Sequence, residues 1–101
     1  MSKDLNKLLK QAQKMQSQMM KAQDEFKKQE IEGSAGGGMV TLKLNGANEL
    51  LSISINPEVV DPEDVEMLED LIVAAYTNAQ EKLKSASDST FGSITNGLKL
   101  P

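Results

Sequence analysis

The first thirty residues carry the pattern of a long amphipathic helix. Between Lys3 and Glu30 there is no Gly or Pro, and good helix formers dominate. Apolar residues recur at alternating steps of three and four, at Leu5, Leu8, Ala12, Met15, Met19, Ala22 and Phe26. This repeat is typical of a helix that packs along another helix. A helix over residues 1–30 is about 40 Å long, so we expect part of it to project or to lie against a second subunit.

The middle of the chain predicts an antiparallel sheet over residues 31–57. The glycine-rich stretch 33–38 favours a turn. Two alternating runs follow, with inward positions at Val40, Leu42 and Leu44 and then at Leu51, Ile53 and Ile55. Asn45-Gly46 between them is a strong hairpin signal, and Asn56-Pro57 ends the second run. The piece 30–32 supplies a candidate third strand.

A second helix is predicted over residues 61–85. Asp61 is the expected N-cap, with Pro62 at the first helical position. One apolar stripe is formed by Val65, Leu68, Ile72, Ala75, Ala79 and Leu83, and it is widened by Met67, Leu71 and Ala74. From residue 86 to 101 the sequence becomes rich in Ser, Thr, Asn and Gly, and we expect a mobile tail there.

The order helix, three strands, helix predicts a single α+β domain over residues 1–101 with local connections. A chain of 101 residues with only three aromatic side chains and no Trp has a small, aliphatic core. We therefore expect a homodimer that completes the burial. The residues predicted to form the core or the dimer contact are Leu5, Leu8, Met15, Met19, Leu68, Leu71 and Ile72.

Two residue types that carry much enzyme chemistry are missing. Without Cys, disulfides, zinc thiolate sites and a cysteine nucleophile are excluded, and without His the commonest general base and metal ligand are lost. The acids Glu63, Glu66, Glu69 and Asp70 lack EF-hand spacing and fit a solvated helix face. The glycine stretch lacks the Gly-Lys-Ser/Thr ending of a P-loop. The sequence therefore predicts no enzyme, no cofactor, no metal and no small-molecule substrate.

The N-terminal segment is polar and rich in Lys, and it lacks the apolar region of a secretion signal. No run approaches about 18 apolar residues, so no membrane span is predicted. The expected location is the cytoplasm.

Charge is distributed unevenly along the chain. The net charge is −4, but residues 1–23 carry five lysines against Asp4 alone, a net of +4. Residues 31–70 carry Lys43 against nine acids. Such asymmetry indicates that different parts of the chain face different partners.

The N-terminal lysines fall on one side of the predicted helix. Lys3, Lys7, Lys10 and Lys14 follow steps of four, three and four, and Lys7, Lys14, Lys21 and Lys28 repeat every seven residues. A row of ammonium groups can bind phosphates by counterion release with little sequence choice. An ordinary solvated face has the same pattern. Arg is absent, which excludes bidentate guanine contacts, so any DNA binding is expected to be led by the backbone.

The cluster Met15, Met19 and Met20 also has two interpretations. It fits a soft-metal site or an adaptable groove, or it fits simple packing at helical spacing. Met20 lies just off the apolar repeat and is the candidate exposed contact.

Several ordered motifs resemble one family. These are Leu8-Leu9-Lys10-Gln11-Ala12-Gln13-Lys14-Met15-Gln16 with Met19, the stretch Gly33 to Gly38-Met39-Val40, Asn45-Gly46, Ile53-Ser54-Ile55-Asn56-Pro57, Met67-Leu68-Glu69-Asp70-Leu71-Ile72-Val73-Ala74-Ala75 and Gly97-Leu98-Lys99-Leu100-Pro101. Together they are similar to the YbaB/EbfC nucleoid-associated proteins over essentially the whole chain.

The resemblance implies an α-β-β-β-α fold with a three-stranded antiparallel sheet, in a tweezer-shaped homodimer whose N-terminal helices are the prongs. It also implies binding to double-stranded DNA with limited sequence preference, altered DNA conformation and association with the nucleoid. We expect the DNA-binding residues to be Lys3, Lys7, Lys10, Lys14 and Lys21, assisted by Lys82 and Lys84. Relatives often carry Arg near the end of the second helix, where this chain has Glu81-Lys82-Leu83-Lys84.

Two alternatives to a DNA-binding role remain open from the sequence. In one, the Met- and Leu-lined prongs grip a partner helix, for example from recombination, replication or transcription machinery. In the other, the chain is a structural dimer whose DNA affinity is incidental.

Overall fold

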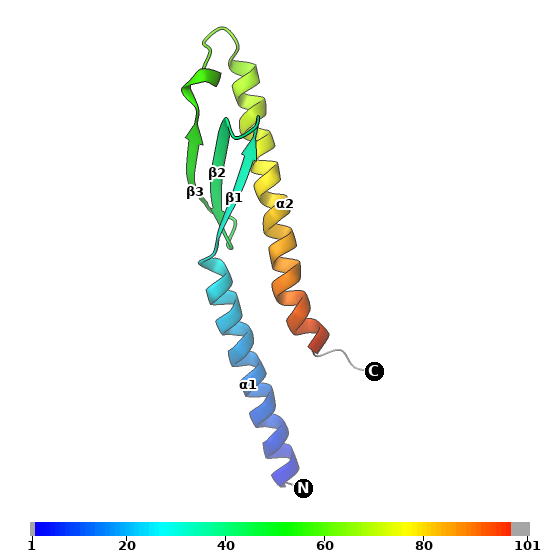
Figure 1. Ribbon diagram of the computed structural model, residues 1–101. Helices are drawn as coiled ribbons and strands as arrows, with labels where there is room; N and C mark the ends of the chain where they lie inside the picture. The colour runs from blue at the N-terminus through cyan, green and yellow to red at the C-terminus, as the bar shows by residue number, and fades with distance from the viewer. Residues whose placement is uncertain (1, 98–101) are drawn as a thin grey trace.

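The protein consists of two long helices joined by a three-stranded sheet (Figure 1). The computed structural model describes residues 2–97. The elements are α1 (Ser2–Lys27), β1 (Glu30–Ala35), β2 (Val40–Asn45), β3 (Leu50–Ile55), the 3-10 helix η1 (Pro57–Val59) and α2 (Val65–Gly97). The strands are antiparallel in the order β1-β2-β3. The predicted α-β-β-β-α fold with a long N-terminal helix is confirmed.

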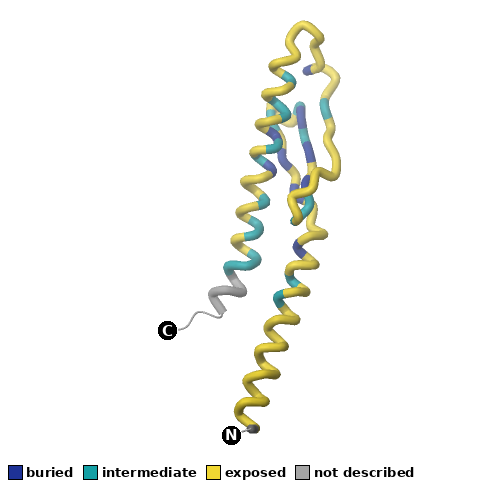
Figure 2. Tube along the Cα trace, turned by 180° about the vertical axis from the view of Figure 1, so that it is seen from behind, coloured by how far each residue is buried: buried dark blue, intermediate teal, exposed yellow. Residues whose placement is uncertain are grey.

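The molecule is strongly elongated. Its principal extents are 76 × 25 × 16 Å, and its radius of gyration is 20.5 Å, against about 13 Å for a compact chain of this length. The cause is visible in Figures 1 and 2, where α1 and the second half of α2 extend beyond the sheet in the same direction. Much of both helices therefore lies outside the packed body.

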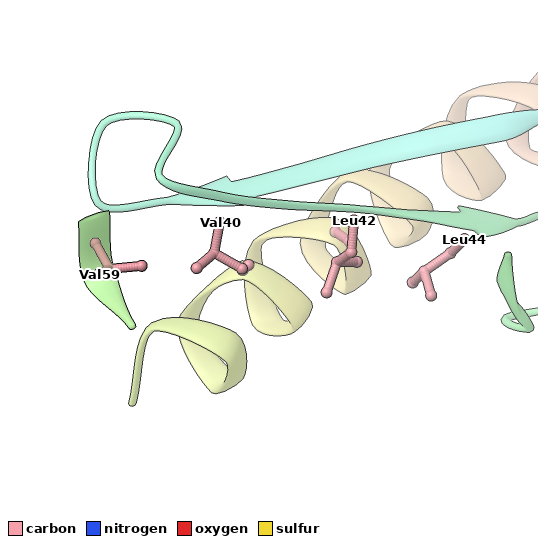
Figure 3. Close-up of a cluster of buried hydrophobic side chains, with 6 residues drawn as sticks. Val40, Leu42, Leu44 and Val59 are labelled. Carbon is pink, nitrogen blue, oxygen red and sulfur yellow. The ribbon is translucent and has the colours of Figure 1, made fainter. Parts of the chain in front are cut away.

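The core lies between one face of the sheet and the first half of α2. Val40, Leu42 and Leu44 point from β2 toward the helix, as Figure 3 shows for this cluster, which also includes Val59. Ala75 and Ala79 on α2 are fully buried against them. The small residues bring the helix close to β1, where a Cβ on Gly33 would overlap the Ala75 carbonyl oxygen and Ala79. Gly33 is thus a packing position inside β1, whereas the sequence placed it in a turn.

The remaining glycines of the stretch 33–38 lie in the turn between β1 and β2. Gly36, Gly37 and Gly38 all have positive φ, at 64°, 67° and 93°. Glycine adopts this region without the steric cost that a Cβ brings. The predicted glycine turn is confirmed for these three residues.

The β2–β3 hairpin forms where the sequence predicted it, but through different residues. Asn45 is central, because its side-chain Oδ1 accepts hydrogen bonds from the backbone N–H groups of Ala47 and Glu49, at 2.9 and 3.0 Å. Asn48, with φ of 63°, takes the left-handed conformation, and Gly46 does not. Asparagine tolerates this conformation better than most residues.

Strand β3 is only partly covered, contrary to the expectation that its apolar residues face a buried core. The register pairs Ile53 with Leu42 and Ile55 with Val40, so these isoleucines share the face on which α2 lies. Yet Leu51 is 49% exposed and Ile53 43% exposed. The reason is that α2 packs mainly on β1 and β2, which leaves β3 at the uncovered edge.

Helix α2 begins later than predicted. Asp61 does not cap it, because the Asp61 carboxylate accepts a hydrogen bond from the Glu63 N–H at 2.9 Å and closes a turn before the helix. The helix starts at Val65, and the Asp64 carboxylate accepts from the Met67 N–H at 3.3 Å as its N-cap. Residues 61–64 therefore form a turn.

Helix α2 also ends later than predicted. It continues to Gly97, so the predicted end at residue 85 is wrong; the expected tail is helical over residues 86–97, and residues 98–101 lie outside the described part. The stripe that faces the core continues through Ala86 and Thr90, three and seven residues after Leu83, and these positions are half-buried. The polar composition concealed a continuing helical periodicity.

Candidate nucleic-acid interface

Helix α1 stands free of the body over most of its length. Every residue from Lys3 to Gln18 is exposed, whereas Met19 and Ala22 are half-buried and Phe26 is buried. Figure 2 shows the N-terminal part of this helix in the colour of exposed residues. Sixteen exposed residues correspond to about four helical turns. A macromolecule can therefore approach this part of α1 from any side.

Five lysines form one face of α1, and we call Lys3, Lys7, Lys10, Lys14 and Lys21 the lysine row. At about 100° per residue their side chains fall within one side of the helix. The row extends over roughly 27 Å of helix axis from first to last member. No carboxylate within residues 2–97 forms an ion pair with any of them; the ion pair found in this range joins Lys43 and Glu30, at 3.7 Å. The row thus presents charges that no ion pair within residues 2–97 neutralises.

The apolar repeat of α1 lies on another side of the same helix. We call Leu5, Leu8, Ala12, Met15, Met19, Ala22 and Phe26 the apolar seam. Leu5 is 58% exposed, Leu8 62% and Met15 39%, so the first half of the seam has no covering partner among residues 2–97. Met20, which the sequence singled out, is also exposed. Lys7 and Lys14 directly precede Leu8 and Met15, so each of these two lysines lies about 100° around the helix from the apolar residue that follows it.

The predicted core residues divide into two groups. Leu68, Leu71 and Ile72 on α2 are half-buried and pack against the core. Leu5, Leu8 and Met15 belong to the exposed seam instead, because the N-terminal part of α1 extends beyond the packed body. The structure therefore separates a monomer core from an apolar surface that stays open.

The base of α1 is fixed at one contact point. The Phe26 ring meets Phe91 of α2 edge to face, with ring centroids 5.3 Å apart and an interplanar angle of 68°. On the other side, a Cβ on Gly46 would overlap the backbone carbonyl of Phe26. A small pocket between the two helices and the hairpin is lined by Gln23, Phe26, Lys27, Gly46, Ala47, Ser87 and Phe91. This contact sets the direction in which α1 leaves the sheet.

Sequence reasoning missed this contact. Gly46 was assigned to the hairpin, and Phe91 was placed in the expected tail. The i, i+3, i+7 continuation from Leu83 through Ala86 and Thr90 is the signal that could have extended α2 and brought Phe91 beside α1. The close approach of Gly46 to Phe26 is a tertiary feature that leaves no local pattern.

The two predicted assisting lysines lie on α2 and not on the helix that carries the lysine row. Lys82 and Lys84 are exposed. Residues two apart on a helix point about 200° from each other, so these side chains project from opposite sides of α2. Only one of them can face a duplex that is held against α1.

The opposite end of the molecule is acidic. Residues 58–70, over η1 and the start of α2, contain seven carboxylates and no lysine. In Figure 1 this end lies at the top and the free end of α1 at the bottom. The charge asymmetry in the sequence thus becomes a separation along the long axis.

Other kinds of site find no support in the described part of the chain. Within residues 2–97 no three potential ligands of a metal ion gather, and no helix there has the length and apolarity to cross a membrane.

The family is shown by comparison with known proteins. A long, free helix with an unpaired lysine row, attached to an α-β-β-β-α body, defines a class of candidate DNA-binding proteins. Residues 1–98 match the model of the YbaB/EbfC DNA-binding family, and the chain belongs to this family.

Named relatives cover nearly the whole chain. A nucleoid-associated protein of Clostridium novyi is 51% identical over 98 residues, which are 97% of this chain and 86% of the relative. A nucleoid-associated protein of Pelotomaculum thermopropionicum is 45% identical over 101 residues, covering all of this chain and 96% of the relative. The fold is also similar to the crystal structure of an uncharacterized protein from Helicobacter pylori, with a TM-score of 0.59 and 24% identity over 81% of this chain and 92% of that one.

Proposed function

We propose that this protein is a nucleoid-associated protein that binds double-stranded DNA through the phosphate backbone. The observation that carries the proposal is the lysine row, which forms no ion pair within residues 2–97 and has four of its five members on the part of α1 that is exposed on all sides. Ammonium groups bind phosphate oxygens as point charges and release condensed counterions, which favours affinity over sequence choice. Membership of a DNA-binding family and the names of the relatives support the same conclusion and a location in the cytoplasm, on the nucleoid.

We further propose that the functional unit is a homodimer. The chain exposes 7700 Å², whereas a compact monomer of its mass exposes about 5,600 Å². The excess of about 2,000 Å² exceeds the roughly 800 Å² that one partner contributes to a stable interface. Exposed apolar side chains lie on β3, at Leu50, Leu51 and Ile53, and in the segment that leads from β3 into α2, at Val60 and Val65. We define these five residues as the β3 patch and assign it to the dimer contact.

A dimer of this kind has two α1 helices, the prongs, and both contact one duplex. Each prong supplies its own lysine row, and simultaneous engagement raises the affinity through effective concentration. To contact both prongs at once, the duplex must adopt a conformation that brings its phosphates to both lysine rows. Binding therefore changes the shape of the DNA, at an elastic cost. The acidic end is turned away from the DNA, because like charges near phosphates are costly.

The proposal is tested by neutralising part of the lysine row. Lys7→Gln with Lys14→Gln should weaken binding to duplexes of unrelated sequence about equally, by roughly tenfold or more at moderate salt. The control is Lys27→Gln with Lys43→Gln, which makes the same change in net charge off the row. Fluorescence anisotropy with labelled duplexes measures both. Equal losses of DNA affinity in the two double variants, or a loss of affinity for one DNA sequence alone, would contradict binding through the lysine row.

A second candidate function is recognition of a partner helix by the apolar seam. The exposure of Leu5, Leu8 and Met15 favours it. The two functions use different sides of α1. Leu5→Gln with Leu8→Gln therefore removes the seam and leaves the lysine row intact, and DNA binding that survives this change assigns the two functions to separate surfaces.

A further inference from the structure

A shallow groove on the first half of α2 combines an apolar floor with an acidic rim. Its walls are formed by Asp64, Glu66, Met67, Asp70, Leu71 and Ala74. Met67 is 39% exposed and Leu71 is half-buried, so apolar surface remains accessible along the floor. We call this feature the acidic groove. Its composition fits an amphipathic helix that is apolar on one stripe and basic beside it.

The acidic groove lies on the β1 side of α2. Leu71 is the nearest side chain to Gly36, at the end of β1, and the Ser34 N–H of β1 donates a hydrogen bond to Asn78 Oδ1 at 3.1 Å. Strands β1 and β3 are the opposite edges of the sheet. A dimer contact through the β3 patch therefore leaves the acidic groove open.

Helix α1 of the same sequence has the complementary surface. Leu8 and Met15 are exposed and seven residues apart, as are Met67 and Ala74 in the groove. Seven residues span about 10 Å of helix axis, so two apolar layers can meet at the same spacing. Helix α1 carries six lysines against three acids, opposite the uniformly acidic rim.

The positions of the charges specify the direction of the contact. Lys7 and Lys14 immediately precede Leu8 and Met15, just as Glu66 and Asp70 immediately precede Met67 and Leu71. Residue i−1 lies about 100° around a helix from residue i, in the same rotational sense in both helices. In an antiparallel pair the two charged flanks therefore fall on the same side of the contact, whereas in a parallel pair they fall on opposite sides.

We propose that the acidic groove of one molecule binds the α1 helix of another copy in an antiparallel arrangement. The contact joins two different surfaces, so it does not close on itself and can extend into chains of molecules. It also uses Lys7 and Lys14, which the proposed function places on DNA phosphates. The acidic groove thus competes with DNA for the same helix, and duplex DNA dissolves the assembly.

Sedimentation velocity at about 50 mM and about 300 mM salt tests this proposal without DNA. The wild type should form species at low salt that are larger than those it keeps at high salt, because the β3 patch is apolar whereas the groove contact also depends on ion pairs, which salt screens. Glu66→Gln with Asp70→Asn should weaken this association about tenfold. Glu58→Gln with Glu81→Gln makes the same change in net charge outside the groove and should leave it intact. Added duplex should return the wild type to its high-salt size.

A charge exchange gives the sharpest form of the test. One protein carries Lys7→Glu with Lys14→Glu, and a second carries Glu66→Lys with Asp70→Lys. Each protein alone should fail to associate, and mixing the two should restore the association. A wild type without larger species at low salt, or groove variants that assemble like the wild type, would overturn the proposal. The salt series and the charge exchange are carried out without DNA and do not depend on DNA affinity, so loss of the proposed function and loss of this contact are distinguished.

Discussion

If two chains pair through the β3 patch as proposed, changing Ile53 to Lys is expected to give monomers and to weaken DNA binding by about 100-fold or more. Ile53 is in the middle of β3, on the α2 face of the sheet but at the edge that α2 does not cover, and it is 43% exposed. A charge placed there must be buried without a partner if the dimer forms, which is costly. Once the subunits separate, each prong binds alone, and the gain from two tethered contacts is lost.

The matched control for this prediction is Ser54→Lys. Ser54 neighbours Ile53 on the same strand and points to the other face of the sheet, so the two variants carry the same net charge. Light scattering coupled to gel filtration measures the mass of each. Should Ile53→Lys remain a dimer, the β3 patch is not the contact between subunits.

Changing Gly46 to Ala is expected to destabilise the protein by about 3 kcal/mol and to misdirect α1. The new Cβ would occupy the space of the Phe26 backbone carbonyl, which cannot move without displacing the end of the helix. The Phe26 ring would also lose its placement against Phe91. Since α1 carries the lysine row, its displacement should lower DNA affinity as well as the free energy of unfolding.

Urea denaturation of Gly46→Ala and Gly92→Ala separates this close approach from a general effect of removing glycine. A Cβ on Gly92 meets no atom within 4 Å, and the residue lies in α2. Ala there should stabilise the protein by up to about 1 kcal/mol through helix propensity. Equal stabilities of Gly46→Ala and the unchanged protein would mean that α1 is not anchored as described.

The regular elements were predictable because their signals are local. The helical repeat over α1 and the alternation at Val40, Leu42 and Leu44 in β2 each depend on neighbours a few residues away. The predicted ends of the second helix were less accurate. Asp61 and Asp64 both suit a helix N-cap, and only the hydrogen bonds in the structure decide between them. The prediction for residues 86–97 failed for another reason. Ser and Thr lowered the helical signal of the sequence, whereas in the structure this part of α2 is helical and contacts α1 through Phe91 and Phe26.

The features that depend on packing between distant segments could not be read from the sequence. The alternation in β3 predicted burial for Ile53, but which strands α2 covers is decided by the close approach at Gly33. For the same reason the sequence assigned Leu5 and Leu8 to a core or contact without showing that they extend beyond the body. The lysine row was visible from its spacing alone, yet its freedom from ion pairs within the described chain needed the structure.

The measurement that tests the central claim most directly is the salt dependence of DNA affinity for the wild type and for Lys7→Gln, Lys10→Gln and Lys14→Gln combined. If these lysines bind phosphates in both prongs of a dimer, log K should fall steeply with log salt in the wild type, and the triple change should reduce that slope by up to about 5. An unchanged slope, or no detectable wild-type binding to any duplex at about 50 mM salt, would contradict phosphate recognition by α1.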